Sequence, residues 1–316
     1  MTVEMERLFL PANYSLGRIA VYLPGEREPS EFLDARGTIQ IPKGARLFFD
    51  AGQEVCDDAS RIHVVPERLL ANGISFFEKN LDKMDFRELR SLRPRSLAIT
   101  FCNGLQFEQL RQLGELGSLE HLNLGQTPLK VPDFSWVLQF PSLKTLLLSG
   151  SGADDSSVEF LARLRRLEEL HLTRCRLSDY GVQAIWRFAS LRIVDFGKCA
   201  IGDEALEGVG RCSALNSLKV SDTRISDKGV EVIVTEALRN VQQLSSLTLR
   251  SCRITDKALV RLASLRSLTF IDLFCTEVTA QGAKFLKESL PECRIFAGSD
   301  KGGGQKLWQV DDAVEA

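Results

Sequence analysis

The stretch Leu167–Ser190, LEELHLTRCRLSDYGVQAIWRFAS, contains one complete structural unit of this chain. Leu170 and Leu172 alternate with a polar residue, which is the period of a β-strand. Val182 and Ile185 lie three positions apart farther along, which is the spacing of a helix with one apolar face. The stretch therefore predicts a strand, a turn and a short helix, in that order.

The turn of this unit contains small polar residues. Cys175 follows Leu172 by three positions and precedes Leu177, which completes the spacing L-x-x-L-x-L-x-x-C-x-L that begins at Leu167. Ser178 comes next, at the start of the predicted helix. We expect its side chain to accept hydrogen bonds from the first free backbone amides of that helix.

The unit recurs along most of the chain. An apolar residue occupies the position of Leu170 nine times, at Leu97, Leu122, Leu146, Leu170, Val194, Leu218, Leu247, Ile271 and Ile295. Successive members are 24 or 25 residues apart, except for one gap of 29. This period indicates a solenoid, in which each unit packs only on its neighbours and the apolar side chains share one core. The longer gap predicts a longer helix within residues 215–243.

This spacing resembles that of the leucine-rich repeat family. The helical halves ISDKGV (225–230) and ITDKAL (254–259) are similar to the cysteine-containing, ribonuclease-inhibitor-like branch and to the bacterial short-repeat branch. The resemblance implies an α/β solenoid with a parallel β-sheet on its concave face and short helices on its convex face. It also implies binding on the concave face, although a fold alone does not determine a function.

Two further segments are expected to flank the repeats at 94–296, and one of the repeats departs from the pattern. Residues 1–65 show short alternating runs separated by glycine and proline, which predicts antiparallel strands that cap the first repeat. Prolines at 128, 132 and 141 predict an irregular or 3₁₀ turn in the third repeat. Residues 297–316 include three consecutive glycines and are expected to form a flexible tail.

Residues 66–93 allow two interpretations. In the first they form a degenerate repeat with Ile74 and Phe76 at the strand positions. In the second, VPERLLANGISFF followed by DFRELRSL resembles an F-box, which would make the chain an adaptor subunit of a ubiquitin ligase that recruits substrates through the repeats. Gly73 would lie inside the helix that an F-box requires, where glycine costs about 1 kcal/mol relative to alanine. Burial of Leu70, Ile74 and Phe76 would count against the F-box.

Composition and charge limit the classes of partner. The chain is 44% hydrophobic and 26% charged, as soluble proteins are. No apolar run approaches the roughly 18 residues of a membrane helix, and the N-terminus does not have the form of a secretory signal. The net charge of −2 provides no general attraction to nucleic acid or to an anionic membrane. We therefore expect a cytoplasmic monomer that binds neither.

The eight cysteines do not form a disulfide or zinc pattern. Four of them occupy the small-residue position of the repeat, which other repeats fill with serine or threonine: Cys102, Cys175, Cys199 and Cys252. No C-x-x-C pair occurs, which disfavours zinc. We expect reduced thiols that bond to the backbone of the adjacent turn, in a reducing compartment, and no metal or other cofactor.

The concave face is the candidate binding site. Side chains that alternate with the strand leucines face solvent there. The candidate partner-binding residues are His171, Arg174, Asp195, Lys198, Lys219, Asp222, Arg250, Phe270 and Phe274. Charges of both signs are interleaved, which fits a protein partner better than a phosphate backbone. Phe270 and Phe274, with Phe296, allow two interpretations: exposed aromatics that anchor the partner, or aromatics that the tail or a terminal cap covers.

Catalysis has little support in the sequence. His171 lies near Glu169 and Asp195 in the predicted sheet, but no activated nucleophile or oxyanion donor accompanies them. The GSG at 150–152 is not followed by the Lys-Ser or Lys-Thr of a phosphate-binding loop. The predicted function is therefore a non-catalytic protein–protein interaction module, or scaffold, with no catalytic residue.

Overall fold

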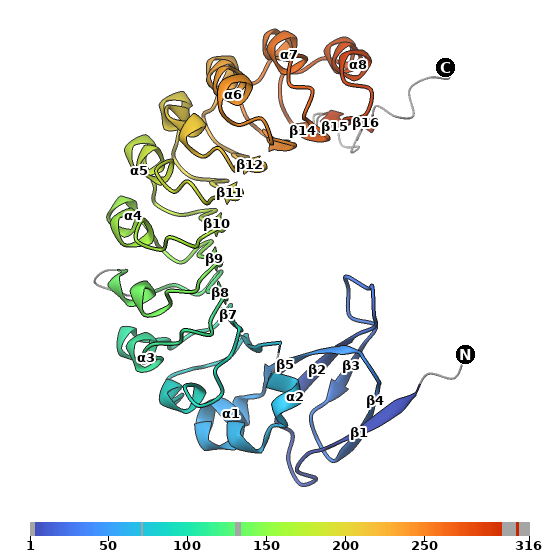
Figure 1. The fold of residues 1–316 in the computed structure, drawn as a ribbon, viewed down its shortest axis with the longest axis vertical. Helices are drawn as coiled ribbons and strands as arrows, with labels where there is room; N and C mark the ends of the chain where they lie inside the picture. The colour runs from blue at the N-terminus through green and yellow to red at the C-terminus, as the bar shows by residue number, and fades with distance from the viewer. Residues whose placement is uncertain (1–3, 71, 130–133, 299–307, 310–316) are drawn as a thin grey trace. The chain divides into compact units, whose positions relative to one another are not determined.

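The computed structural model describes residues 4–70, 72–129, 134–298 and 308–309. Its contacts divide the chain into two compact units, Met1–Leu147 and Leu148–Ala316 (Figure 1). The boundaries predicted at 65, 93 and 296 stay predictions. Most of the predicted tail lies outside the described residues.

The first unit begins with antiparallel strands where the short alternating runs predict them. They are β1 (Met5–Phe9), β2 (Gly17–Tyr22), β3 (Glu31–Asp34), β4 (Thr38–Pro42) and β5 (Arg46–Ala51). Strand β1 pairs with β4, and β2 pairs with both β3 and β5. Three short helices follow, α1 (Gln53–Asp57), the 3₁₀ helix η1 (Ala59–Val64) and α2 (Glu67–Leu70).

Parallel strands continue the sheet of the first unit from β5. They are β6 (Ile74–Phe77), β7 (Ser96–Thr100), β8 (His121–Asn123) and β9 (Thr145–Leu147). Between them lie η2 (Phe86–Leu89), α3 (Phe107–Gln112) and η3 (Ser135–Gln139). The 3₁₀ helix η3 overlaps the end of the segment predicted to be irregular or 3₁₀ in the third repeat, and residues 130–133 of that segment lie outside the described residues. Proline is unfavourable inside an α-helix because it lacks the backbone donor.

The ambiguous segment 66–93 provides a strand of this sheet. Ile74 of β6 is paired with Leu97 of β7. Leu70, Ile74 and Phe76 are at most 5% exposed. These are the positions that an adaptor would need on its surface, so their burial supports the degenerate repeat.

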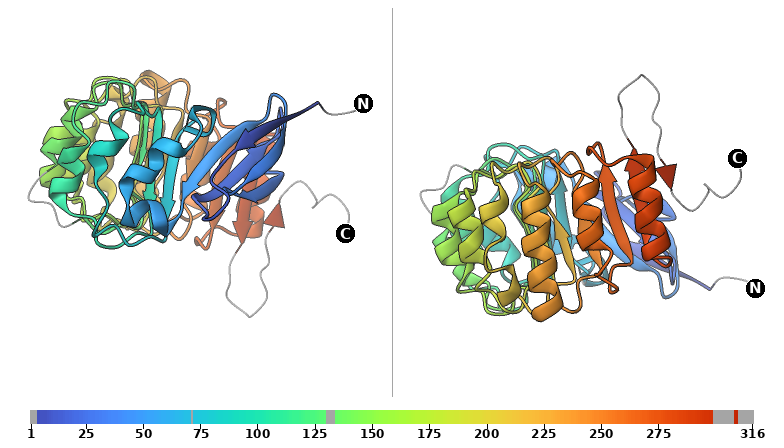
Figure 2. Two further views of the ribbon diagram at one scale, coloured as in Figure 1. Left: turned by 90° about the horizontal axis from the view of Figure 1, so that it is seen from below. Right: turned by 90° about the horizontal axis from the view of Figure 1, so that it is seen from above.

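The second unit alternates parallel strands and short helices. The strands are β10 (Glu169–His171), β11 (Ile193–Asp195), β12 (Ser217–Lys219), β13 (Ser246–Thr248), β14 (Phe270–Phe274) and β15 (Arg294–Gly298), and β16 (Trp308–Gln309) pairs antiparallel with β15. The helices are α4 (Asp155–Leu161), α5 (Asp179–Ile185), η4 (Asp203–Leu206), η5 (Val209–Arg211), α6 (Asp227–Arg239), α7 (Asp256–Leu262) and α8 (Ala280–Ser289). The helices all lie on one side of the strands (Figure 1), and α6, α7 and α8, in orange to red, stand side by side (Figure 2). With 13 residues, α6 accommodates the 29-residue gap.

The predicted repeat positions form the core of this unit. The residues paired across β10–β15 are Leu170, Val194, Leu218, Leu247, Ile271 and Ile295, and each is 0% exposed. Burying a side chain of this size contributes about 1.5–3 kcal/mol before conformational entropy is subtracted. The sequence period therefore sets both the register of the sheet and its buried face.

Each helix start is tied to the next repeat through an aspartate. Asp203 accepts hydrogen bonds from Ser226 N at 2.8 Å and from Ser226 Oγ at 2.6 Å. Asp227 and Asp256 accept the same pair of bonds from the threonines that begin α7 and α8. We call this series the aspartate ladder, with members Asp155, Asp179, Asp203, Asp227 and Asp256. It links the helix starts of successive repeats.

Ser178 serves the ladder instead of its own helix. Its Oγ donates to Asp155 Oδ2 at 2.5 Å, and its side chain accepts no capping bond from α5. The expectation that Ser178 caps the helix is therefore wrong: its hydroxyl donates to the preceding repeat and accepts no bond from an amide of α5. At α6, by contrast, the side chain of Ser226 both bonds the ladder and accepts from Lys228 N.

The repeat cysteines bond the preceding repeat as predicted. Cys199 Sγ donates to Leu172 O at 3.1 Å, and Cys252 Sγ donates to Val220 O at 3.1 Å. All eight cysteines are thiols. Burial raises the pKa of Cys199 to about 12, which keeps the thiol neutral and able to donate.

This burial predicts strong protection of the thiols. At about pH 8 we expect a thiol reagent to modify at most Cys275 rapidly in the folded protein, because the other seven cysteines are buried. Counting reacted thiols by absorbance, before and after adding denaturant, tests this. A Cys275→Ser variant should show no rapid phase, and rapid reaction of several thiols would contradict the packing.

Within the described residues, no helix is both long enough and apolar enough to cross a membrane.

Candidate functional site

The candidate residues lie on one surface of the second unit, the face of β10–β15 turned away from the helices. We call it the open sheet face. His171, Asp195 and Lys219 occupy paired positions on the adjacent strands β10, β11 and β12. Their side chains are half-buried, and strands in a sheet are about 4.8 Å apart. The structure thus brings these three predicted residues into one row.

A second row lies in the turns that follow the strands. Arg174, Lys198 and Asp222 are exposed, and their φ angles are 60°, 59° and 55°. Each backbone amide donates to the next repeat, for example Lys198 N to Ser221 O at 2.8 Å. Side chains disfavour this left-handed conformation by about 1 kcal/mol or more, whereas glycine adopts it freely, as Gly150 does in the preceding repeat at φ 70°. Three successive repeats thus present a charged side chain at a position that suits glycine, and Ser251 and Cys275 occupy it in the next two repeats at φ 56° and 57°.

Arg250 and Phe274 belong to the row one position before these turns. Phe274 is 3% exposed, so the expectation of an exposed aromatic at this position is wrong. Strand β14 extends to Phe274 and pairs there with Gly298, and the Arg250 guanidinium carbon lies 4.5 Å from the ring centroid. The ring is therefore covered, and Arg250 itself remains exposed.

An aromatic pair lies at the end of the face that contains β14 and β15. The ring centroids of Phe270 and Phe296 are 5.5 Å apart, and both side chains are half-buried. Arg294 pairs with Phe270 across the strands, and its guanidinium carbon lies 5.8 Å from the Phe296 ring centroid. Sequence reasoning missed Arg294. In β15 the side chains alternate, with Ile295 and Ala297 buried and Phe296 turned outward. Arg294 lies two residues before Phe296, so the alternation places it on the same face.

Carboxylates surround the one imidazole of this face. His171 Nε2 lies 2.9 Å from Glu169 Oε1, and His171 Nδ1 lies 3.8 Å from Asp195 Oδ2. The general-base pair considered from the sequence is thus present as a cluster. The described part of the chain contains no group of three His, Cys, Asp or Glu side chains arranged to hold a metal ion.

The basic residues of the face are not used in ion pairs within the described chain. Arg174, Lys198 and Lys219 form no ion pair with any residue in the described ranges. On the helical side, Arg261 pairs with Glu231 at 3.0 Å. Unpaired charges on one surface are available to a partner.

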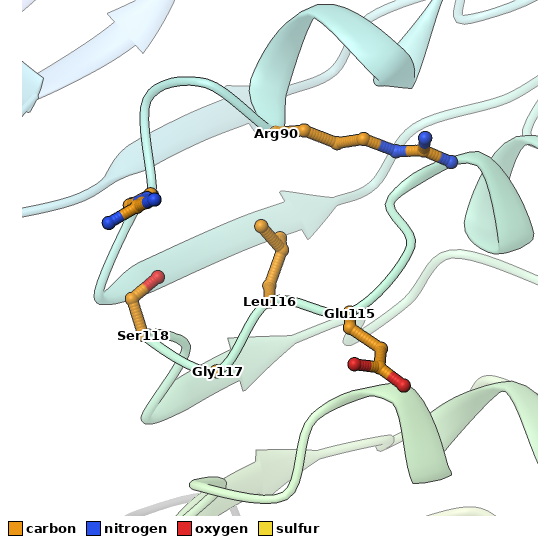
Figure 3. A pocket seen from close by; sticks show the side chains of 6 residues that line it. Arg90, Glu115, Leu116, Gly117 and Ser118 are labelled. Carbon is orange, nitrogen blue, oxygen red and sulfur yellow. The ribbon is translucent and has the colours of Figure 1, made fainter.

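The first unit has a separate pocket of about 440 Å³ between the loops that lead into β7 and β8 (Figure 3). It is lined by Arg90, Arg93, Glu115, Leu116, Gly117 and Ser118. Arg90 Nε donates to Gln112 O at 2.6 Å, so this guanidinium is already used in joining two repeats.

Comparisons with known proteins agree with this architecture. A family model described as Leucine Rich repeat matches residues 164–185, 189–210 and 211–234. The solved structure of internalin InlF from Listeria monocytogenes has a TM-score of 0.50 at 18% identity, covering 72% of this chain and 74% of that chain. A chain of the mouse RP105/MD-1 complex has a TM-score of 0.51 at 21% identity, covering 70% of this chain and 37% of that chain. No curated protein matches the sequence. At these identities the structural likenesses show the fold alone.

Proposed function

This chain is a leucine-rich repeat protein, and on that premise we propose that it is a non-catalytic module that binds a partner protein on the open sheet face. The observation that carries the proposal is the row of exposed, charged side chains at Arg174, Lys198 and Asp222. A turn that served only the fold would be more stable with glycine in this conformation. Charged residues there fit a role in contact with a partner.

The binding surface in this proposal consists of the residues predicted from the sequence, with two changes. Phe274 supports Arg250 from beneath instead of contacting the partner directly. Arg294 joins the surface beside Phe270 and Phe296. The branch of the family, the cytoplasmic location and the monomeric state belong to the proposal, and the eight thiols support a reducing compartment.

Two features support binding over catalysis. The imidazole of His171 is hydrogen-bonded to Glu169, and Asp195 lies 3.8 Å from its other nitrogen, so the ring is already held within the chain. The buried cysteines under this face have raised pKa values because of burial, as at Cys175 and Cys252, which makes them poor nucleophiles. The adaptor alternative gains no support, since Leu70, Ile74 and Phe76, which it needs on the surface, are buried.

Affinity purification from the source cells tests the proposal. We expect the partner that copurifies with the parent protein to be lost from the double variant Arg174→Glu and Lys219→Glu. The matched control reverses two exposed lysines at the starts of α6 and α7, Lys228→Glu and Lys257→Glu, with the same change in net charge. A partner retained by the first variant, or lost equally from both, would contradict binding at the open sheet face.

A glycine variant separates binding from folding. Lys198→Gly removes the side chain at a left-handed position, so we expect the free energy of unfolding to stay the same or to rise by up to about 1 kcal/mol. Partner binding should nevertheless weaken. Urea unfolding and the same affinity purification measure the two effects.

A further inference from the structure

We propose that the open sheet face binds an acidic segment of the partner, with an aromatic or apolar side chain of that segment against Phe270 and Phe296. This inference rests on the proposed function and adds the chemistry of the partner. It follows from which charges on the face are already used within the chain and which are not.

The carboxylates of the face are mostly engaged internally. Glu169 Oε1 lies 2.9 Å from His171 Nε2. Asp195 Oδ1 accepts a hydrogen bond from Gly197 N at 2.8 Å, and Asp272 Oδ1 accepts one from Phe274 N at 2.9 Å. These carboxylates orient the strand ends and the imidazole, so one oxygen of each already has a partner within the chain.

The cations of the face are not engaged in this way. Five basic side chains form no ion pair with a described residue: Arg174, Lys198, Lys219, Arg250 and Arg294. The guanidinium groups of Arg250 and Arg294 lie over the rings of Phe274 and Phe296, and both residues are exposed. Of the four carboxylates Glu169, Asp195, Asp222 and Asp272, only the Asp222 side chain forms no hydrogen bond or ion pair in the described structure. The named residues of the face thus comprise five cations without an ion pair and four carboxylates, three of which are already bonded within the chain.

This local excess has a consequence for recognition. Unpaired cations attract a complementary acidic surface and raise its rate of association, and they repel a basic one. On the helical side of the same unit, Arg261 pairs with Glu231 at 3.0 Å, whereas Lys228 and Lys257 form no ion pair with a described residue. The helical side therefore supplies a matched control for the open sheet face.

The aromatic end adds an anchor. Phe270 and Phe296 are tilted against each other at 5.5 Å and remain half-buried, so part of each ring is accessible. Aromatic side chains at interfaces contribute much of the binding energy when a partner covers them. An acidic segment with one bulky apolar residue therefore fits better than a purely charged one.

The size of the face fits a short extended segment. Six parallel strands span roughly 24 Å at about 4.8 Å per strand, which about seven or eight extended residues cover. A phosphate backbone fits less well, because Asp195, Asp222 and Asp272 interrupt the row of cations with carboxylates. A peptide can place neutral or basic side chains opposite those positions.

A selection from random peptides tests the inference on the full chain. Peptides of about twelve residues, displayed without bias, are selected on the immobilised protein and then measured by fluorescence anisotropy. We expect the selected peptides to be acidic and to contain an aromatic or large apolar residue. Their affinity should fall by about tenfold or more in Lys198→Glu with Lys219→Glu, and also between about 0.05 M and 0.5 M salt.

Charge reversal provides a control that does not depend on lost folding. The double variant Lys198→Glu and Lys219→Glu should bind peptides in which the acidic residues are replaced by lysine, which the parent should not bind. The variant Lys228→Glu and Lys257→Glu, equal in charge but on the helical side, should keep the parent's affinity within about twofold.

Three outcomes would overturn the inference. The selected peptides are neutral or basic, the acidic peptides bind both double variants equally well, or an oligothymidylate of similar length competes as well as the peptides do. The failure of the proposed function is recognised separately. If the copurified partner depends on Arg174 and Lys219 but acidic peptides do not compete with it, only the acidic chemistry is wrong.

Discussion

Replacing Trp186 with alanine is expected to lower the free energy of unfolding of the second unit by about 3–5 kcal/mol. Trp186 is 0% exposed at the end of α5 and packs edge-on against Phe196, with the ring centroids 5.6 Å apart. Its Nε1 donates to Ala205 O at 2.7 Å, in the 3₁₀ helix η4 of the next repeat. Alanine therefore leaves a large cavity and an unsatisfied carbonyl at the same place.

Two further variants separate these contributions. Trp186→Phe keeps much of the apolar volume but loses the donor, so we expect a smaller loss that includes about 1–3 kcal/mol for the unpaired carbonyl. Tyr180→Ala, on the same helix but 76% exposed, should change stability by less than about 0.5 kcal/mol. Urea unfolding followed by circular dichroism and by fluorescence tests both, and coincident transitions establish that one free energy describes the unit. A loss at Trp186→Ala no larger than at Tyr180→Ala would contradict the packing.

The dependence of η4 on Trp186 shows what a repeat pattern predicts and what it does not. The strand positions from Leu97 to Ile295 follow from the period alone, because a residue buried against both neighbours must be apolar in every repeat. The bond between Trp186 and Ala205 joins two repeats at positions that are not repeated elsewhere. Such contacts depend on the residue that the adjacent repeat places opposite. The pattern of a single repeat does not specify that residue.

The candidate site divides in the same way. The alternation of the strands places His171, Asp195 and Lys219 in one row correctly, since successive side chains must point to opposite faces. The burial of Phe274 was not predictable from alternation, because it results from the Arg250 guanidinium above the ring and from the pairing of β14 with Gly298. Likewise, the sequence shows carboxylates and cations in similar numbers. Only the hydrogen bonds of Glu169 and Asp195 show which charges remain for a partner.

The aspartate ladder leads to the second large effect, at a glycine. We expect Gly229→Ala to destabilise the second unit by about 1–3 kcal/mol through overpacking. An alanine Cβ at this position would overlap Asp203 Oδ1 and would lie 2.9 Å from Ile225 Cγ2. Within an ordinary exposed helix, replacing glycine with alanine would raise the stability of the protein by about 1 kcal/mol. A loss of stability at Gly229 would therefore show that the aspartate ladder leaves no room for the new Cβ.

A double-mutant cycle measures the coupling between the glycine and the ladder. Asp203→Ala should itself cost about 1–3 kcal/mol, because the amide and hydroxyl of Ser226 lose their shared acceptor. With Asp203 truncated, the main obstruction to the new Cβ is gone, so the double variant should be more stable than the sum of the two losses predicts. Additive losses, measured by urea unfolding, would show that the carboxylate does not exclude the side chain.

The equivalent position of the next repeat supplies an opposite test. Ala258 occupies in α7 the place that Gly229 occupies in α6, following Thr255 and Asp256 as Gly229 follows Ser226 and Asp227. The repeat before α7 contains the longer helix α6. Ala258 itself is accommodated in α7 at 2% exposure. Ala258→Gly should therefore destabilise by about 1 kcal/mol through loss of helix propensity and packing. If glycine and alanine prove interchangeable at positions 229 and 258, the spacing between successive helix starts does not determine which of the two residues fits. If each is best where it stands, the five-residue insertion has changed which side chain the ladder admits.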